Sequence, residues 1–313
     1  MPELPEVEVV RRGLKPLILN RQIVAIATSG LSLRVPTPLK NLQRWAKGAR
    51  VTKVARRAKF ILLYLDNGAM ILLHLGMTGK IYPATSQTPR RRHDHLWLTL
   101  GEIPGESCAD TDTKIACPEN RFSQGLNSGP NPATELRFND SRRFGLVAVC
   151  SPQEAGNPPL LAKLGPEPLD PDAGAFTPTY LAQYCRHRPT PIKNLLMNNQ
   201  MVVGIGNIYA NEILFAAKVS PFAPANSLSF IACEKIVIAS RKILNQAIAA
   251  GGTTIADFTN TTGESGYFQV QLQVYGRHDQ PCPRCRGLIE RRTQGGRPTF
   301  FCPSCQIKGV EIN

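Results

Sequence analysis

The stretch CPRCRGLIERRTQGGRPTFFCPSC, residues 282–305, contains two Cys-x-x-Cys pairs separated by sixteen residues. Each pair fits a tight turn that supplies two thiolates, and two such turns complete a tetrahedral zinc site. The alternative, four unligated cysteines in a small core, leaves this spacing without a reason. We therefore predict that Cys282, Cys285, Cys302 and Cys305 bind one structural Zn2+. A segment this short also needs the metal in order to fold.

The zinc segment is basic, and so is the whole chain. Seven Lys and Arg stand against three Asp and Glu between Arg277 and Glu311, and the formal net charge of the 313 residues is +14. Such a balance favours a polyanionic partner, either a nucleic acid or an acidic membrane surface. The sequence contains no apolar run of about 18 residues that would span a bilayer. We expect a soluble, cytoplasmic protein without a membrane partner.

Two further observations concern the cellular compartment. The start MPELPEVEVV carries acids where a signal peptide has a basic and then an apolar stretch. The nine cysteines of a long intracellular chain favour metal binding or free thiols over disulfides, because that compartment keeps thiols reduced.

Hydrophobic periodicity divides the chain into a β half and a helical half. A helix is expected at 5–19, and strands are expected at 59–65, 69–75, 96–100 and 144–149. The first two strands are joined by Asp66-Asn67-Gly68, which is typical of a hairpin turn. Further helices are expected at 180–186, 192–197, 208–217 and 228–250. The pattern predicts an α+β fold in which a β-sandwich with an N-terminal helix precedes a helical domain.

Changes in composition indicate the domain boundaries. We expect an N-terminal β-sandwich domain at 1–157, a Pro- and Gly-rich hinge at 158–176, a helical domain at 177–263 and the zinc module at 264–313. Residues of about 101–134 lack apolar periodicity and are interpreted as a long surface loop. Five Asp and Glu against two Lys and Arg in this loop argue against phosphate contact.

The first residues offer an unusual nucleophile. Met1 precedes a small residue, so its removal is expected, and Pro2 then becomes a free secondary amine beside Glu3 and Glu6. An α-amine titrates near pH ~8, far below a lysine, so it can attack a sugar aldehyde and form a Schiff base at neutral pH. Glu3 would donate or shuttle a proton. The same residues also suit an ordinary helix start, so alone they decide nothing.

Three other motifs also allow two interpretations when each is considered alone. Lys59, after two arginines and before an apolar strand, suits a phosphate contact or a solvated strand start. Met77 in HLGMTG suits a wedge into a base stack or a core position. Arg142 and Phe144 in SRRFG suit stacking and groove contacts or a basic turn.

A glycine-rich turn precedes the helix expected at 208–217. In Gly204-Ile205-Gly206-Asn207, Tyr209 occupies the position of the third glycine, which excludes a dinucleotide-binding fingerprint. We expect this turn to offer backbone N–H groups to one phosphate instead.

In their order along the chain, these motifs resemble those of one family. MPELPEVE, RRAK, HLGMTG, HDH, SRRFG, VVGIGNIYANEILF, GGTT and the terminal zinc ribbon are similar to the motifs of bacterial formamidopyrimidine-DNA glycosylases, also called 8-oxoguanine-DNA glycosylases. The resemblance covers nearly the whole chain outside residues of about 101–134. It implies a monomer in which duplex DNA lies between a β-sandwich and a helix-two-turn-helix domain with a β-hairpin zinc finger. The lesion is flipped out of the stack.

The resemblance also implies a reaction and the residues that perform it. The family removes oxidised purines in base-excision repair and cleaves abasic sites by β- and δ-elimination through a Schiff base. Pro2 matches the nucleophile that attacks C1′, and Glu3 matches the acid of base removal. Lys59 matches the proton donor of β-elimination and Arg297 that of δ-elimination.

A second set of residues matches positions that contact DNA. Met77, Arg142 and Phe144 match the residues that fill the space left by the flipped base, with Arg142 facing the orphaned cytosine. Contacts to phosphates or nearby groups are implied for His93, Arg142, Arg188, Lys193 and Asn207. Arg188 stands where relatives have lysine.

Two other functions are weighed against this one. The endonuclease VIII branch is similar but prefers oxidised pyrimidines, and Leu4 together with the set Met77, Arg142 and Phe144 favours the purine branch. A non-catalytic binder would keep the helical and zinc modules and lose the chemistry, yet all four matched catalytic residues are present. It would bind DNA with ordinary salt dependence and leave the strand intact.

Overall fold

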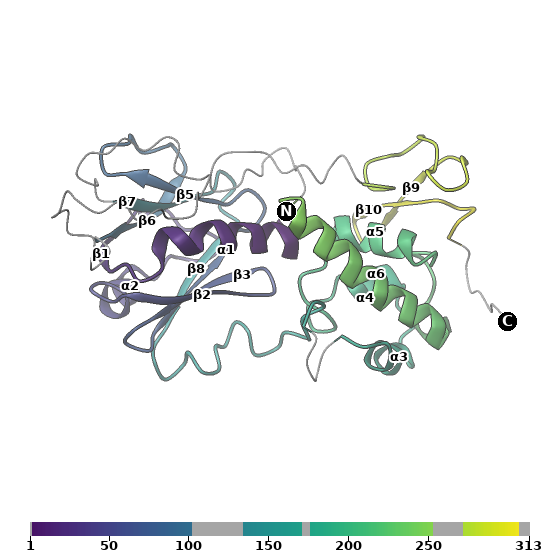
Figure 1. Cartoon of the computed structure of the whole chain (residues 1–313), viewed down its shortest axis with the longest axis horizontal. Coiled ribbons are helices and arrows are strands. Elements are labelled where there is room, and N and C mark those ends of the chain that lie inside the picture. Colours follow the sequence, from purple (N-terminus) through teal and green to yellow (C-terminus); the bar gives the residue numbers. More distant parts are fainter. Residues whose placement is uncertain (1, 102–133, 171–175, 253–271, 307–313) are drawn as a thin grey trace, which may run out of the picture.

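The computed structural model describes residues 2–101, 134–170, 176–252 and 272–306. The chain forms two halves that lie side by side, and the first turn of helix α1 lies at their junction (Figure 1). Every helix and strand predicted from periodicity is present, with ends that differ by at most two residues. Residues 102–133, which were expected to form a surface loop, lie outside the described residues, so that expectation stays a prediction.

The described residues of the first half form one long helix, one short helix and eight strands. In order they are α1 (Leu4–Ile18), β1 (Ile23–Thr28), α2 (Leu39–Trp45), β2 (Val51–Arg57), β3 (Phe60–Leu65), β4 (Met70–His74), β5 (Lys80–Thr85), β6 (Asp94–Leu100), β7 (Thr134–Asn139) and β8 (Leu146–Cys150). They form two four-stranded antiparallel sheets, with orders β2-β3-β4-β8 and β1-β6-β7-β5. The predicted β-sandwich is confirmed.

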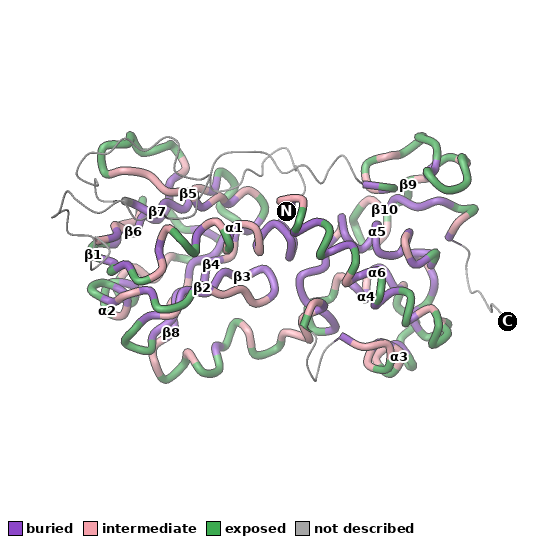
Figure 2. Tube along the Cα trace, in the orientation of Figure 1, coloured by how far each residue is buried: buried purple, intermediate pink, exposed green. Residues whose placement is uncertain are grey.

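The core of the sandwich explains why the sequence of β3 is a continuous apolar run. Ile61 and Leu63 face the other sheet and α1 in the main cluster of the first half. Leu62, which points to the opposite face, is buried in a second cluster with Met70 and Leu72. Because both faces of this sheet are covered, its strands lack the polar alternation of a half-exposed sheet. Figure 2 shows the buried strands of this half inside an exposed outer trace.

The second half is helical and ends in a hairpin. It contains α3 (Pro178–Cys185), α4 (Ile192–Leu196), α5 (Asn207–Ala216), the 3-10 turn η1 (Ala225–Ser227), α6 (Phe230–Ala249), β9 (Glu290–Gln294) and β10 (Arg297–Phe301). Helix α5 is buried over most of its length, mainly through apolar residues of this cluster and also through Asn211 and Glu212. A helix that is buried on all sides is expected at the middle of a bundle.

Hydrogen bonds and ion pairs join the halves and the hinge. The backbone N–H of Leu4 donates to the carbonyl of Gly204 at 2.9 Å, and Glu167, in the predicted hinge, forms ion pairs with Arg56 and Arg57 at 2.8 and 3.0 Å. The described part of the hinge is thereby tied to the β-sandwich. The boundaries proposed for the domains stay predictions. Among the described residues, no helix combines the length and apolar character needed to cross a membrane.

Candidate active site and metal centre

The candidate active site is built around the Glu3 carboxylate, which lies at the N-terminus of α5. Its oxygens accept hydrogen bonds from the backbone N–H groups of Gly206 at 2.7 Å, Ile208 at 2.9 Å and Tyr209 at 3.3 Å. These donors have no partner within the helix, and the helix dipole favours a negative charge there. The start of α5 therefore binds a carboxylate of the chain itself. The expectation that this turn presents its N–H groups to a phosphate is wrong, because Glu3 occupies them.

Two glycines make this contact possible. A Cβ atom on Gly206 would lie 2.4 Å from the Glu3 carboxyl carbon, and one on Gly204 would lie 2.6 Å from Cβ of Leu4. Gly204 also has a φ of +82°, which L side chains rarely adopt. The glycines of VVGIGN thus let the first residues of the chain lie directly against the backbone before α5.

A second buried carboxylate supports the first. Glu6 has no exposed surface; it accepts a hydrogen bond from the Glu3 backbone N–H at 2.8 Å and another from the Tyr209 hydroxyl at 2.6 Å. Pro2, next to Glu3, is also buried. These hydrogen bonds anchor the start of α1 at the junction, and Pro2 directly precedes the residues that form them.

Burial and neighbouring charges shift the pKa values of this site in opposite directions. Burial is the largest effect on Glu3 and raises its pKa, and the charge of Glu6 adds to the rise, against the charge of Lys59 and the backbone N–H donors. Burial lowers the pKa of Lys59, and Arg297 adds to this, against the attraction of Glu3 and Glu6. A carboxyl that keeps its proton to a higher pH, and an ammonium that loses its proton at a lower pH, are suited to proton transfer.

Arg297 reaches this cluster from the other half of the molecule. It is exposed at the first position of β10, and its charge lowers the pKa of both Lys59 and Lys193. The residue after Arg297 anchors the hairpin to α5, because the Pro298 carbonyl accepts a hydrogen bond from Asn207 Nδ2 at 3.1 Å. Three of the four proposed catalytic residues, Glu3, Lys59 and Arg297, thus interact electrostatically, although they are far apart in the sequence.

Two residues near the site were not predicted from the sequence. His74, at the end of β4, packs edge-on against Phe60 with ring centroids 4.9 Å apart, and burial, with the charges of Arg34 and Lys59, lowers its pKa to about 4. Burial raises the pKa of Tyr275, as does the charge of Glu3. His74 is part of HLGMTG, but no spacing singled it out; Tyr275 carries no sequence signal.

The residues proposed to enter the DNA stack lie on two adjoining loops. Met77 and Phe144 expose 36% and 42% of their surface, unusual for large apolar side chains, and the Arg142 guanidinium lies 4.9 Å from the centre of the Phe144 ring. Asp140 links the loops, because it accepts hydrogen bonds from the Thr78 hydroxyl and from the Gly145 N–H. The two linked loops therefore present three largely exposed side chains.

The remaining predicted contacts are placed differently. His93 is half-buried, and its carbonyl accepts the Asp140 N–H at 2.9 Å. Arg188 is exposed after α3 and lies 3.8 Å from the centre of the Tyr184 ring. Lys193 has no exposed surface; its ammonium donates to Thr299 Oγ1 at 2.6 Å, and burial lowers its pKa to about 8. Its contact with a phosphate stays a prediction, and in this structure it holds the hairpin.

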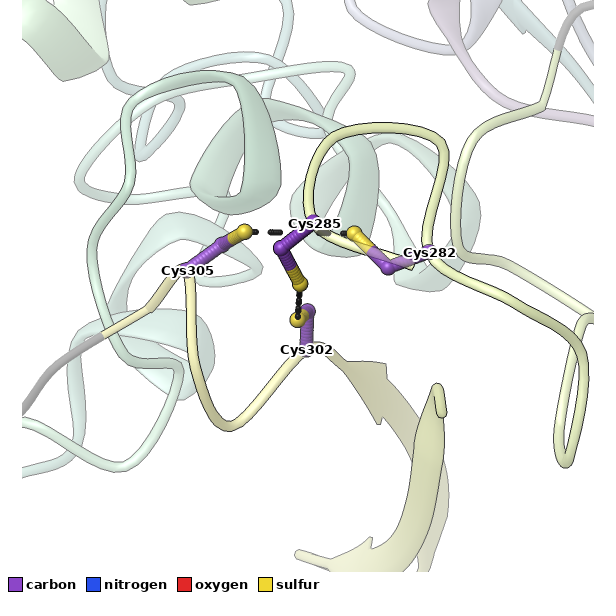
Figure 3. A group of neighbouring side chains, drawn as sticks. All are labelled: Cys282, Cys285, Cys302 and Cys305. Atoms are coloured by element: carbon purple, nitrogen blue, oxygen red, sulfur yellow. Dashed lines mark hydrogen bonds between the residues drawn. The ribbon is translucent and has the colours of Figure 1, made fainter. Parts of the chain in front are cut away.

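The four cysteines converge at the base of the hairpin (Figure 3). Their sulfur atoms all lie within 4.8 Å of one another, with Cys282 and Cys305 3.9 Å apart and Cys285 and Cys302 3.4 Å apart. Four thiolates around one Zn2+ at about 2.3 Å require sulfur separations of about 3.8 Å. The geometry fits the predicted tetrahedral site, whose chemistry would be structural, since all four positions are filled by protein.

Comparisons with known proteins agree with this architecture. Residues 1–147 match the family described as Formamidopyrimidine-DNA glycosylase N-terminal domain, 164–259 the Formamidopyrimidine-DNA glycosylase H2TH domain, and 279–307 the Zinc finger found in FPG and IleRS. A formamidopyrimidine-DNA glycosylase from Thiobacillus denitrificans is 41% identical over 308 residues, which cover 98% of this chain and all of the relative. One from Dinoroseobacter shibae is 38% identical over 317 residues, with the same coverage of both chains.

Solved structures are similar over the same length. The Lactococcus lactis Fpg bound to DNA with an abasic site and MutM bound to DNA with carbocyclic 8-oxo-G are each 30% identical, with a TM-score of 0.80. Each similarity covers 98% of this chain and all of the other.

Adding a single methyl group at Gly206 should break the junction. Gly206→Ala would place a Cβ 2.4 Å from the carboxyl carbon of Glu3, which is a steric clash. We therefore expect the free energy of unfolding, measured by urea denaturation, to fall by about 1–3 kcal/mol. Gly156→Ala is the control, because its Cβ would meet no atom within 4 Å. Equal stability of the two variants would contradict the tight packing described for the junction.

His74 should make stability depend on pH. Its pKa is about 4 in the folded state and about 6.5 unfolded, so the unfolded chain binds more protons between these values. Stability contributed by neutral His74 is therefore present above pH ~6.5 and is lost as the pH falls toward ~4, by up to about 3 kcal/mol. Urea unfolding at pH ~7.5 and ~4.5 should show a smaller pH dependence for His74→Gln than for the unmodified protein; parallel losses in both would exclude His74 as the cause.

Proposed function

Because the chain belongs to the formamidopyrimidine-DNA glycosylase family, we propose that it removes oxidised purines, chiefly 8-oxoguanine and formamidopyrimidines, from duplex DNA and then cleaves the abasic site. The observation that carries the proposal is the convergence of Pro2, Glu3 and Lys59 at the junction of the two halves, with Arg297 close enough to shift the pKa of Lys59. Relatives of known structure are bound to DNA containing a Fapy lesion, 8-oxo-G or an abasic site.

In the proposed reaction, Pro2 attacks the sugar after Met1 has been removed. The amine nitrogen bonds to C1′ while the bond from C1′ to the base breaks, and the leaving base receives a proton. Glu3 suits this donor role, because burial raises its pKa and keeps it protonated to a higher pH than an exposed glutamate. Opening of the sugar ring then gives the iminium that links Pro2 to the DNA.

Strand cleavage follows by two eliminations. Loss of a C2′ proton expels the 3′ phosphate, and a second proton loss expels the 5′ phosphate, which leaves a one-nucleotide gap. We assign proton transfer in the first elimination to Lys59 and in the second to Arg297. The lowered pKa of Lys59 makes its ammonium a better proton donor than an exposed lysine. The pair of buried carboxylates compensates the positive charge that collects there.

DNA recognition is divided between the two halves in this proposal. Met77, Arg142 and Phe144 fill the space left by the flipped nucleotide, and Arg142 faces the unpaired cytosine. His93, Arg188, Lys193 and Asn207 contribute contacts to phosphates or nearby groups. The chain is proposed to act as a monomer, with one Zn2+ held by the four cysteines.

Borohydride trapping tests the nucleophile. With duplex DNA that contains an abasic site, reduction should yield a covalent adduct on the N-terminal peptide, located at Pro2 by mass spectrometry. Lys59→Met should still form this adduct, because Lys59 is assigned only proton transfer. A non-catalytic binder would give no adduct at all, and an adduct that maps to Lys59 would sink the assignment to Pro2.

The hairpin allows the metal and the catalytic roles to be separated. Cys302→Ser should lose zinc and all DNA cleavage, because the hairpin no longer folds around the metal. Arg297→Ala should keep its full zinc content and base excision yet slow the second elimination about 10- to 100-fold. Zinc content is measured by atomic emission and cleavage products by gel electrophoresis. Loss of zinc from the arginine variant would refute this separation.

A further inference from the structure

Three consecutive arginines, Arg90, Arg91 and Arg92, precede His93 in the loop between β5 and β6. The strands β5 and β6 lie on either side of β7 and both run antiparallel to it. The loop must therefore return along β7 from one end of the sheet to the other. All three arginines are exposed in this crossing segment.

The segment lies on a row of side chains that is suited to holding arginines. Tyr82 and Trp97 both pair with Arg137 in the register of the sheet, so the three side chains are neighbours on one face. The Arg90 guanidinium lies 4.1 Å from the centre of the Trp97 ring, and that of Arg91 lies 4.4 Å from the centre of the Tyr82 ring. Stacking restricts each guanidinium, and its N–H edges stay available for the oxygens of a phosphate.

Arg137 fixes the backbone of the loop from below. Only 1% of its surface is exposed, and its guanidinium donates to the carbonyls of Thr85, Thr88 and Pro89 at 3.2, 2.7 and 3.0 Å. Asp94 closes the other end, where it accepts the Arg91 backbone N–H at 2.8 Å. A buried charged side chain thus serves to shape an exposed basic loop.

The charges of the loop have no acidic partner among the residues that the structure describes. Within the described part of the chain, none of the three guanidiniums at 90–92 forms an ion pair. The nearby acids Asp94 and Glu135 are buried and pair with Arg137, at 3.7 and 2.8 Å. Three exposed cations without an acidic partner in the described ranges, two of them stacked on rings, are expected to attract an external polyanion.

The loop is continuous with the proposed DNA surface. The His93 carbonyl, one residue beyond Arg92, accepts the Asp140 N–H at 2.9 Å. Asp140 in turn holds the loops that carry Met77 and Phe144. The three arginines therefore extend the basic surface away from the flipped-base position on the β-sandwich half.

We propose that Arg90, Arg91 and Arg92 form an additional binding surface for the phosphate backbone of the duplex outside the lesion pair. The inference rests on the proposed function in DNA binding, but it assigns these residues no part in the chemistry. Ring-stacked arginines would contact phosphates without reading sequence. An acidic protein partner is the alternative occupant, and it predicts no change in DNA affinity on mutation.

The test is the salt dependence of binding, measured by fluorescence anisotropy on duplexes with and without 8-oxoguanine. Each lost phosphate contact should reduce the slope of log K against log salt by about one, so Arg90→Ala with Arg91→Ala should reduce it by about two. The reduction should be equal on both duplexes, because backbone contacts ignore the lesion. Single-turnover excision at saturating enzyme should not change. Binding to the undamaged duplex tests the loop even if the protein excises no base. Absence of excision would therefore contradict the proposed function without deciding whether the loop binds DNA.

Two further variants keep the result interpretable. Arg92→Ala removes a charge from a side chain for which no ring contact is described, and it should reduce the slope of log K against log salt by about one. This single variant remains informative if the double variant, which removes both stacked arginines, disturbs the sheet. Arg44→Ala is the matched control, since Arg44 is an exposed arginine that stacks at 4.9 Å on Trp45 of α2. Unchanged slopes in both loop variants, or an equal reduction in Arg44→Ala, would overturn the proposal.

Discussion

The hydrogen bonding of one carboxylate to the start of α5 is the interaction on which the rest of this structure depends. Glu3 belongs to the β-sandwich half, and its three N–H donors belong to the helical half. A partly buried charge at a helix N-terminus is stabilised by up to about 2 kcal/mol, while burial itself opposes the charge and raises the pKa of Glu3. The same contact therefore aligns the two halves and leaves a carboxyl that can hold a proton beside Pro2.

Helix α5 carries this alignment to the zinc hairpin. Asn207 donates to the Pro298 carbonyl, Asn211 accepts the Phe300 N–H, and Glu212 accepts three consecutive backbone N–H groups of residues 273–275. A buried polar group is stabilised by a hydrogen-bond partner, and these partners belong to the hairpin or to the segment of chain that precedes it. The hairpin that carries Arg297 is thus positioned by the same helix that binds Glu3, and the four cysteines close its far end.

Charge is organised differently inside and outside the molecule. At the junction, Glu3 and Glu6 lie near Lys59 in a buried cluster, where low polarity strengthens the effect of neighbouring charges on the pKa values of Glu3 and Lys59. On the surface of the sandwich, Arg137 pairs with two buried acids, and the arginines of residues 90–92 form no ion pair with any described residue. The net charge of +14 is therefore unevenly distributed, with unpaired cations where a polyanion can approach.

Features that depend on a local pattern could be predicted from the amino-acid sequence. The spacing of apolar residues predicted α1, β3 and α5, because one face or both faces of each element must be buried. The Cys-x-x-Cys spacing predicted the metal site, because two tight turns bring four thiolates together. Contacts between residues far apart in the chain became known only from the fold. In the folded chain, the backbone N–H of Tyr209 donates to Glu3, which lies more than 200 positions away in the sequence. Lys193 is likewise buried against Thr299. Such pairings follow from how two halves pack, and no local period encodes them.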